Sequence, residues 1–158
     1  MNRQNSQYNI MVLAAILILF PFTGCSGGDD SRQQDNTTQQ TSGLTDFQLE
    51  HGIGPIQEPV ELDDLDQELA SQGKEVFEQK CSACHKPTER YIGPALGDVL
   101  DRRTPAYVMN MMMNPDEMTK KHPEARKLLQ EYMSPMPYQN VSKEQARAIV
   151  EYFRTIEM

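Results

Sequence analysis

Apolar positions in the second half of the chain recur at the spacing of helices. In residues 65–80 the apolar side chains include Leu65, Leu69, Val76 and Phe77, and near the C-terminus they include Ala146, Ile149, Val150 and Phe153. One face of an α-helix repeats about every 3.6 residues, so these positions predict amphipathic helices, each with one buried face. After residue 24 no stretch alternates between apolar and polar with the period of two that indicates a β-strand. The pattern therefore predicts an all-α domain.

Helix start signals divide this part of the chain further. Asp63 and Asp64 are expected to cap the helix at about 65–80, and Ser142 with Gln145 forms a capping-box pattern before the last helix. Three more starts, each with proline at the first helical position, are Thr104-Pro105, Asn114-Pro115 and His122-Pro123. We expect about four to five helices.

The N-terminus has the features of a secretion signal. The unbroken apolar run of residues 10–20 is too short to cross a hydrocarbon layer of roughly 30 Å, but it fits the core of a signal peptide. It is followed by Phe22-Thr23-Gly24-Cys25, which resembles a bacterial lipobox with phenylalanine in place of the usual leucine. We expect residues 1–24 to be a lipoprotein signal peptide and Cys25 to be the lipidated residue. An uncleaved anchor that ends in a free cysteine is the alternative.

Three segments follow the expected cleavage site. Residues 25–43 contain no apolar residue after Cys25, so they cannot offset the entropy of ordering and should form a flexible, lipidated tether of about 25 Å. Residues 44–62 carry a few apolar side chains but are interrupted by Gly and Pro, which predicts an extended arm that packs on the domain. Residues 63–158 are the predicted domain.

The chemistry of the chain is concentrated in Cys81-Ser82-Ala83-Cys84-His85. Two thiols at this spacing can each add to one vinyl group of a single porphyrin, and the adjacent histidine can bind the iron from one face. The C-x-x-C-H pattern is therefore interpreted as a c-type haem attachment site, with Cys81 and Cys84 as attachment residues and His85 as an iron ligand. The predicted cofactor is one covalent haem c.

Other interpretations of the thiol pair stay open. A structural zinc ion needs four ligands, and the only further histidines are His51 and His122. His51 lies in a Gly/Pro-rich stretch, where we expect it at the surface or partly buried and not on a metal. A thioredoxin-like redox pair would require a βαβ context, which the helical flanks do not provide. Two buried cysteines beside a chance histidine are the simplest alternative.

Charge and cysteine use limit the partners. The formal net charge of −8 becomes −9 without residues 1–24, because Arg3 is the only charged residue removed. Such a surface repels nucleic acid and acidic lipid headgroups, so we expect no nucleic-acid partner and redox partners with a basic docking face. The membrane connection would be the lipid on Cys25.

Lipid and haem would use all three cysteines, which leaves none for a disulfide. We expect a monomer.

From about Leu65 to the C-terminus the chain resembles a class I cytochrome c domain. The helix with Gly73 and Phe77 before the haem motif is similar to the first helix of that family, in which the glycine allows a close crossing with the last helix. The resemblance implies that Tyr152 or Phe153 supplies an aromatic contact at the crossing. It also implies the fold of the family, a small all-α domain of about four to five helices around one covalent haem.

The loop after the motif carries a second part of the resemblance. In Gly93-Pro94-Ala95-Leu96, the family pattern implies that the Pro94 carbonyl accepts a hydrogen bond from Nδ1 of His85. Such a bond would set the orientation and basicity of the imidazole. The pattern also implies that Leu96 packs on the haem ring.

Further along, the family often places partners for the haem propionates where this chain has Arg102 or Arg103 and Tyr107. The resemblance therefore implies that these residues bind the cofactor. Solvated loop charges and an ordinary core aromatic residue are the alternative.

The second iron ligand is expected in the loop before the last helix. Met136, which is followed by Pro137, stands where the family presents a thioether ligand, and Met133 is the alternative. The methionines among residues 109–113 are expected to fill the core instead. A soft thioether favours ferrous iron and raises the reduction potential, and two filled axial positions leave no site for oxygen or peroxide.

These features predict an electron-transfer protein and not an enzyme. We expect a lipid-anchored monohaem cytochrome that shuttles single electrons in a respiratory chain, on the periplasmic side of a bacterial membrane. The lipid would lie in the outer membrane or in the outer leaflet of the inner membrane, with surface exposure as a further location. Residues 51–56 and the stretch from 139–141 through 151–153 resemble lipoprotein cytochromes that accompany nitrous oxide reductases. A haem enzyme, or a gas or redox sensor, with an open axial site is the alternative.

Overall fold

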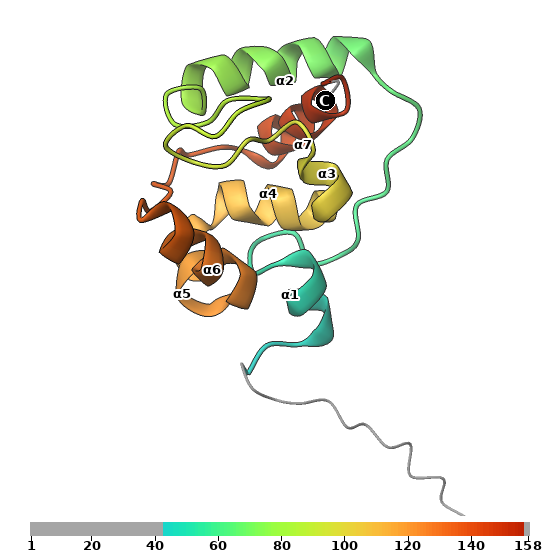
Figure 1. The fold of residues 1–158 in the computed structure, drawn as a ribbon. Helices are drawn as coiled ribbons and strands as arrows, with labels where there is room; N and C mark the ends of the chain where they lie inside the picture. The colour runs from blue at the N-terminus through green and yellow to red at the C-terminus, as the bar shows by residue number, and fades with distance from the viewer. Residues whose placement is uncertain (1–42, 157–158) are drawn as a thin grey trace, which may run out of the picture. The chain divides into compact units, whose positions relative to one another are not determined.

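The computed structural model describes residues 43–156, which form seven α-helices (Figure 1). They are α1 (Asp46–His51), α2 (Gln67–Lys80), α3 (Val99–Arg102), α4 (Pro105–Met113), α5 (Pro115–Lys121), α6 (Pro123–Tyr132) and α7 (Lys143–Phe153). The described residues contain no strand, so the predicted all-α fold is confirmed. The five helices expected from the sequence are present, and α1 and the four-residue α3 are additional. The predicted signal peptide and Cys25 lie outside the described residues.

The crossing of α2 and α7 organises the fold, and Figure 1 shows the two helices lying across each other. A Cβ atom at Gly73 of α2 would overlap the Ala148 carbonyl of α7, so only glycine lets the two backbones approach this closely. One turn later, Phe77 packs against both Tyr152 and Phe153, with ring centroids 5.5 and 5.8 Å apart. The glycine crossing implied by the resemblance is therefore present, and both candidate aromatic residues take part.

The arm of residues 44–62 differs from the prediction in its first part, which is helix α1 and not extended chain. The side chains of Thr45 and Gln48 form a capping box, in which each accepts a hydrogen bond from the backbone N–H of the other. The remainder is non-helical and packs on the domain as expected, with Ile56 in the main core. Buried Asn110 of α4 binds the N–H and the carbonyl of Ile56, both at 2.9 Å, which fixes the arm in place.

Helix α2 begins two residues later than expected, and Asp63 and Asp64 do not cap it. The cap is Asp66, whose carboxylate accepts two hydrogen bonds of 3.0 Å from N–H groups of the first turn. The N–H of Asp66 itself donates to the buried carboxylate of Glu151 in α7 at 2.9 Å. A tertiary contact thus selects one cap among three neighbouring aspartates.

Helix α4 lies between α7 on one side and α5 and α6 on the other (Figure 1), and it contributes to two apolar clusters. The main core between α2, α4 and α7 includes Phe77, Met109, Met112, Ile149 and Val150. A smaller cluster toward α5 and α6 contains Tyr107, Met118 and Ala125. None of the described helices combines the length and the hydrophobicity that crossing a membrane requires.

Candidate haem site

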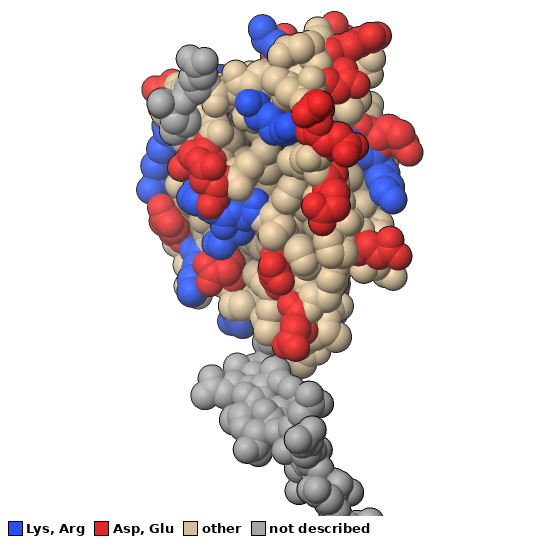
Figure 2. Space-filling model, turned by 90° about the vertical axis from the view of Figure 1, so that its right-hand side faces the viewer, with Lys and Arg blue, Asp and Glu red and all other residues tan. Residues whose placement is uncertain are grey.

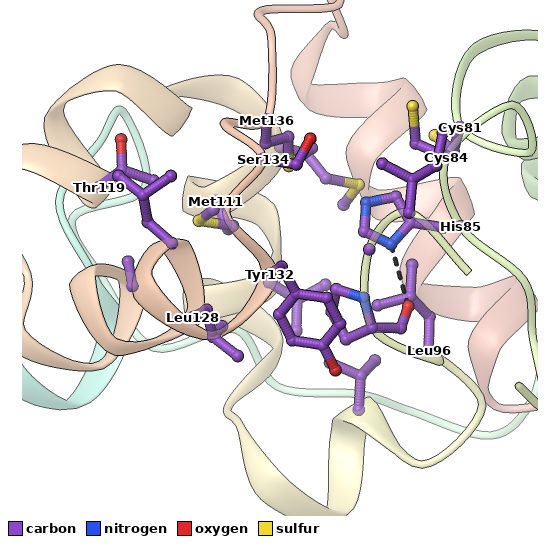
Figure 3. Close-up of a pocket in the computed structure, with 18 of the residues that line it drawn as sticks. Cys81, Cys84, His85, Leu96, Met111, Thr119, Leu128, Tyr132, Ser134 and Met136 are labelled. Carbon is purple, nitrogen blue, oxygen red and sulfur yellow. Dashed lines mark hydrogen bonds between the residues drawn. The ribbon is translucent and has the colours of Figure 1, made fainter. Parts of the chain in front are cut away.

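The two thiols and the imidazole of the C-x-x-C-H motif lie in a tight turn directly after α2. Cys81 ends the helix, and its N–H donates to the Phe77 carbonyl at 2.8 Å. The N–H groups of Cys84 and His85 then both donate to the Cys81 carbonyl, at 3.0 and 2.9 Å. These local bonds bring both thiols and the imidazole to the wall of one cavity (Figure 3).

The His85 imidazole is held through its Nδ1 atom, which donates to the Pro94 carbonyl at 3.0 Å. The contact implied by the resemblance is therefore present, and it leaves Nε2 as the nitrogen that can bind a metal. Gly93 lies against the ring, because a Cβ atom there would come within 2.8 Å of Nδ1. Burial lowers the pKa of His85, although the bond to Pro94 opposes this shift. The imidazole is thus kept neutral, the form that binds metals.

The cavity reaches from this turn to α4, α5 and α6, and every predicted cofactor residue lines it. These residues are Cys81, Cys84, His85, Pro94, Leu96, Arg102, Tyr107 and Met136, together with Arg103. Figure 3 shows the Met136 side chain extending toward the His85 imidazole, beside the two cysteines. Met133 does not line the cavity, and its side chain is 83% exposed. Of the two methionines considered as iron ligands, only Met136 lines the cavity.

Several residues that line the cavity were not predicted to do so. Met111 was expected to fill the core, but it lies one turn after Tyr107 on the same face of α4 and lines the cavity, and this i, i+4 spacing is the signal that identifies it. Thr119 comes from α5, and Leu128 and Tyr132 come from α6. These three are brought to the cavity by tertiary packing, and no motif marks them.

The cavity is also lined by two arginines, Arg102 and Arg103, and by Tyr107. The Tyr107 hydroxyl is buried and has no hydrogen-bond partner among the described residues. Burial raises the pKa of this phenol, so it stays protonated and can donate. The Arg103 guanidinium lies 5.3 Å from the centre of the Tyr107 ring and pairs with Glu124 at 2.8 Å, while Arg102 pairs with Asp98 at 2.6 Å. A buried donor next to Arg103, in a cavity that Arg102 also lines, suits a ligand that carries carboxylates.

The other interpretations of the thiol pair fit the structure less well. Within residues 43–156, no three His, Cys, Asp or Glu side chains converge to hold a metal ion. Burial raises the pKa of Cys81 to about 11, partly offset by Lys80, whereas a redox-active thiol requires a lowered pKa. His51 binds the Thr104 hydroxyl at 2.9 Å and does not line the cavity. Buried His122 caps α6 by accepting from the Glu124 N–H.

Comparison with known proteins agrees with this geometry. The profile of the cytochrome c family matches residues 70–157, which is more than half of the chain. The chain belongs to the cytochrome c family. One covalent haem c and electron transfer are therefore its general cofactor and activity. The donor set of this cytochrome, its largely apolar cavity and the buried Tyr107 hydroxyl all fit that group.

Three solved structures are similar to this cytochrome. Cytochrome c from Rhodothermus marinus has 46% identity over 69% of this chain and 94% of its own chain, with a TM-score of 0.65. An engineered form of that protein, Rma TDE, has 45% identity over 69% and 95% of the two chains and the same TM-score of 0.65. The same engineered protein bound to a carbene intermediate has 46% identity, the same coverage of 69% and 95%, and a TM-score of 0.63. No curated protein gave a match.

Proposed function

We propose that this cytochrome is a lipid-anchored monohaem carrier of single electrons in a respiratory chain, on the periplasmic side of a bacterial membrane. The observation that carries the proposal is that His85 and Met136 line the same cavity as the thiols of Cys81 and Cys84. If the imidazole of His85 and the thioether of Met136 both held the iron, they would leave no free position on it for oxygen or peroxide. This favours electron transfer over catalysis on a bound small molecule.

Each side chain would have a defined task toward the cofactor. Cys81 and Cys84 would hold the haem through thioethers, and His85, oriented by Pro94, would bind the iron. Met136 would supply a soft sulfur that favours the ferrous state. The haem supplies the one-electron couple of its iron. Because the protein holds every ligand in one folded arrangement, a change of oxidation state would require little movement of the chain.

The spectrum of the ferric holoprotein tests this function. We expect a low-spin spectrum with the weak near-infrared band of sulfur-to-iron ligation, and a pigment that acid-acetone does not extract. Met136→Ala should abolish the band and lower the reduction potential, because the soft ligand is lost. Met133→Ala is the matched control and should keep the band. A high-spin spectrum of the wild-type protein would instead favour a haem enzyme or a sensor.

Membrane attachment is proposed from the N-terminal sequence. Phe22-Thr23-Gly24-Cys25 supports lipidation of Cys25, and residues 25–43 would act as the tether. The Cys25→Ala variant should move the holoprotein out of the membrane fraction, measured by its Soret absorbance after cell fractionation. If the variant stays in the membrane fraction, residues 10–20 form an uncleaved anchor. Separating inner from outer membranes would then decide between the two locations.

Partners are proposed from charge. Between residues 58 and 68, six exposed carboxylates occur with no Lys or Arg. They belong to Glu58, Glu61, Asp63, Asp64, Asp66 and Glu68. Figure 2 shows acidic side chains spread over the face that carries this linker between α1 and α2. A redox partner with a basic docking face would be attracted over a long range.

A copper nitrous oxide reductase is the acceptor suggested by the sequence resemblance. Stopped-flow mixing of the ferrous cytochrome with that enzyme should give rapid oxidation that slows as ionic strength rises. Oxidation by a terminal oxidase alone would count against this acceptor and leave the electron-carrier function in place.

A further inference from the structure

The segment that carries Met136 has little structure of its own. We call residues 134–141 the Met136 loop. No backbone–backbone hydrogen bond joins these residues to one another or to any other residue in the described part of the chain. Met133, just before the loop, and Asn140, near its end, have φ values of 52° and 50°, in the left-handed region that disfavours side chains. A loop of this kind requires contacts from elsewhere to keep one conformation.

Lys80 provides such a contact at the end of the loop. It is the last residue of α2 and directly precedes Cys81. Its half-buried Nζ donates to the carbonyls of Gln139 at 3.1 Å and Asn140 at 3.4 Å. A cation that donates to carbonyls makes a stronger hydrogen bond than a neutral donor does. Lys80 therefore connects the haem attachment turn to the last part of the Met136 loop.

Arg90 provides a second contact at the end of α6, just before the loop. One guanidinium nitrogen donates to the Glu131 carboxylate and another to the Glu131 carbonyl, each at 3.2 Å. The group also lies 4.1 Å from the centre of the Tyr132 ring. Glu131 and Tyr132 are the last residues of α6, where helix carbonyls lack intrahelical partners and favour a cation. Arg90 therefore connects the segment after the haem motif to the helix end from which the loop departs.

We propose that Lys80 and Arg90 are positioning residues that together hold the Met136 thioether in the haem cavity. Each ties one end of the Met136 loop to the segment that bears Cys81, Cys84 and His85. The inference rests on the proposed role of Met136 as an iron ligand. Both residues act through the backbone next to or within the loop and do not contact the iron. Their loss therefore changes how often the loop opens, and it does not change which atom binds the iron.

The two contacts differ in exposure, which makes their effects separable. The Arg90 and Glu131 side chains are 57% and 54% exposed, so salt screens their attraction. Lys80 donates to uncharged carbonyls in a partly buried setting, where salt has less influence. Loss of Lys80 should therefore have the larger effect at every salt concentration. The effect of losing Arg90 should become smaller at high salt, because its ion pair with Glu131 is screened while its bond to the Glu131 carbonyl remains.

Imidazole binding to the ferric holoprotein measures loop opening, because free imidazole can take an axial position only when the thioether has left it. Its apparent affinity is proportional to the fraction of open molecules. We expect Lys80→Ala to tighten imidazole binding about tenfold, and Arg90→Ala to tighten it about twofold in low salt and by less in about 1 M salt. Lys74→Ala is the matched control, because Lys74 is an exposed lysine of α2 whose ion pair is with Glu78 of the same helix. Lys80→Arg should restore most of the wild-type affinity.

Limited proteolysis of the same holoproteins is the second readout, because a protease cleaves the backbone of residues 134–141 faster when the loop opens. Cleavage in the loop should accelerate in Lys80→Ala and Arg90→Ala and remain unchanged in Lys74→Ala. If Lys80→Ala matches Lys74→Ala in both imidazole affinity and cleavage rate, the inference is overturned. If the wild-type protein lacks the near-infrared sulfur band, the proposed ligand fails instead, and the cleavage rates alone decide whether Lys80 and Arg90 hold the loop.

Discussion

Residues 81–97 and the Met136 loop face each other across the haem cavity, and they are stabilised in different ways. In the first segment, backbone hydrogen bonds of 2.7–3.2 Å connect the haem motif to its own continuation, including Gly93 N–H to the Cys84 carbonyl and Gly97 N–H to the Pro87 carbonyl. Residues 134–141 have no such bonds within the described structure and depend on Lys80 and Arg90. We call residues 81–97 the histidine wall and the Met136 loop the methionine wall. The histidine wall is held by its own backbone hydrogen bonds, and the methionine wall is held by contacts from other segments.

This difference indicates which of the two proposed iron ligands depends on contacts from segments distant in sequence. The position of His85 follows from neighbours within about ten residues, because Pro94 holds its imidazole and Cys81 holds its backbone. The position of Met136 follows from cationic side chains distant in sequence. We therefore expect the sulfur–iron bond to yield first under heat or denaturant, while the histidine bond persists.

Gly93→Ala should have the largest effect, because it disrupts the histidine wall from within. The added methyl group would come within 2.8 Å of Nδ1 of His85, whose movement would break the bond to Pro94. We expect the unfolding free energy of the holoprotein to fall by about 3 kcal/mol, measured by guanidinium denaturation at the Soret peak. Thr88→Ala, at an exposed position of the same segment, should change it by less than about 0.5 kcal/mol. Equal effects of the two variants would contradict a rigid histidine wall.

Glu151→Gln provides a reference distant from both walls. The buried carboxylate pairs with Arg147 and Arg154 and accepts from the Asp66 N–H. Both arginines are partly exposed, so we expect a loss of about 2 kcal/mol in denaturant unfolding, less than for a fully buried pair. The near-infrared band should not change at neutral pH. Glu75→Gln on the α2 surface is the control, with an expected change below about 0.5 kcal/mol.

The same carboxylate predicts a pH dependence. Burial opposes ionisation of Glu151, but the hydrogen bonds from Arg147 and the Asp66 N–H outweigh it and hold the pKa below the ordinary value of 4.5. Its contribution to stability is therefore present above pH 4.5 and is lost as pH falls through the lower folded-state pKa. Glu151→Gln should flatten the acid limb of a stability profile. An unchanged acid limb would show that other carboxylates control it.

Met133→Gly tests the methionine wall at a strained residue. Met133 ends α6 with a φ of 52°, a conformation that glycine adopts without steric cost. We expect stability to rise by about 1 kcal/mol in denaturant unfolding, with the near-infrared band retained. Met133→Ala keeps the strain and should give no gain. Loss of the band in either variant would make Met133 the ligand and reverse the assignment of Met136.

Pro135→Ala and Pro137→Ala should have the smallest effects. The loop has no backbone hydrogen bonds, so its two proline rings restrict the conformations that it can adopt when it is unfolded. Replacing one proline should lower the free energy of unfolding by about 0.5 kcal/mol. Imidazole should bind about twofold more tightly to each variant. Pro87→Ala on the histidine wall should leave imidazole affinity unchanged. A larger effect at Pro87 than at Pro135 or Pro137 would invalidate the contrast between the walls.

Particular residues show how far prediction from sequence could reach. The haem motif, the capping box of Ser142 and Gln145, and the bond between His85 and Pro94 involve residues three to nine positions apart. The cap of α1 by Thr45 is equally local and was available from the same rule. The contacts of Glu151, Asn110 and Arg90 join residues 41 to 85 positions apart, and no local pattern indicates them.

The amino-acid sequence alone predicted five of the seven described helices and the motif of two cysteines and a histidine for haem attachment. These follow from helical periodicity and from a motif that acts over a few residues. Only the tertiary structure decided that Met136 and not Met133 faces the cavity, that Asp66 caps α2, and that Lys80 and Arg90 border the Met136 loop. The physical reason is that these outcomes depend on distant segments meeting when their apolar faces are buried together, which local spacing does not encode.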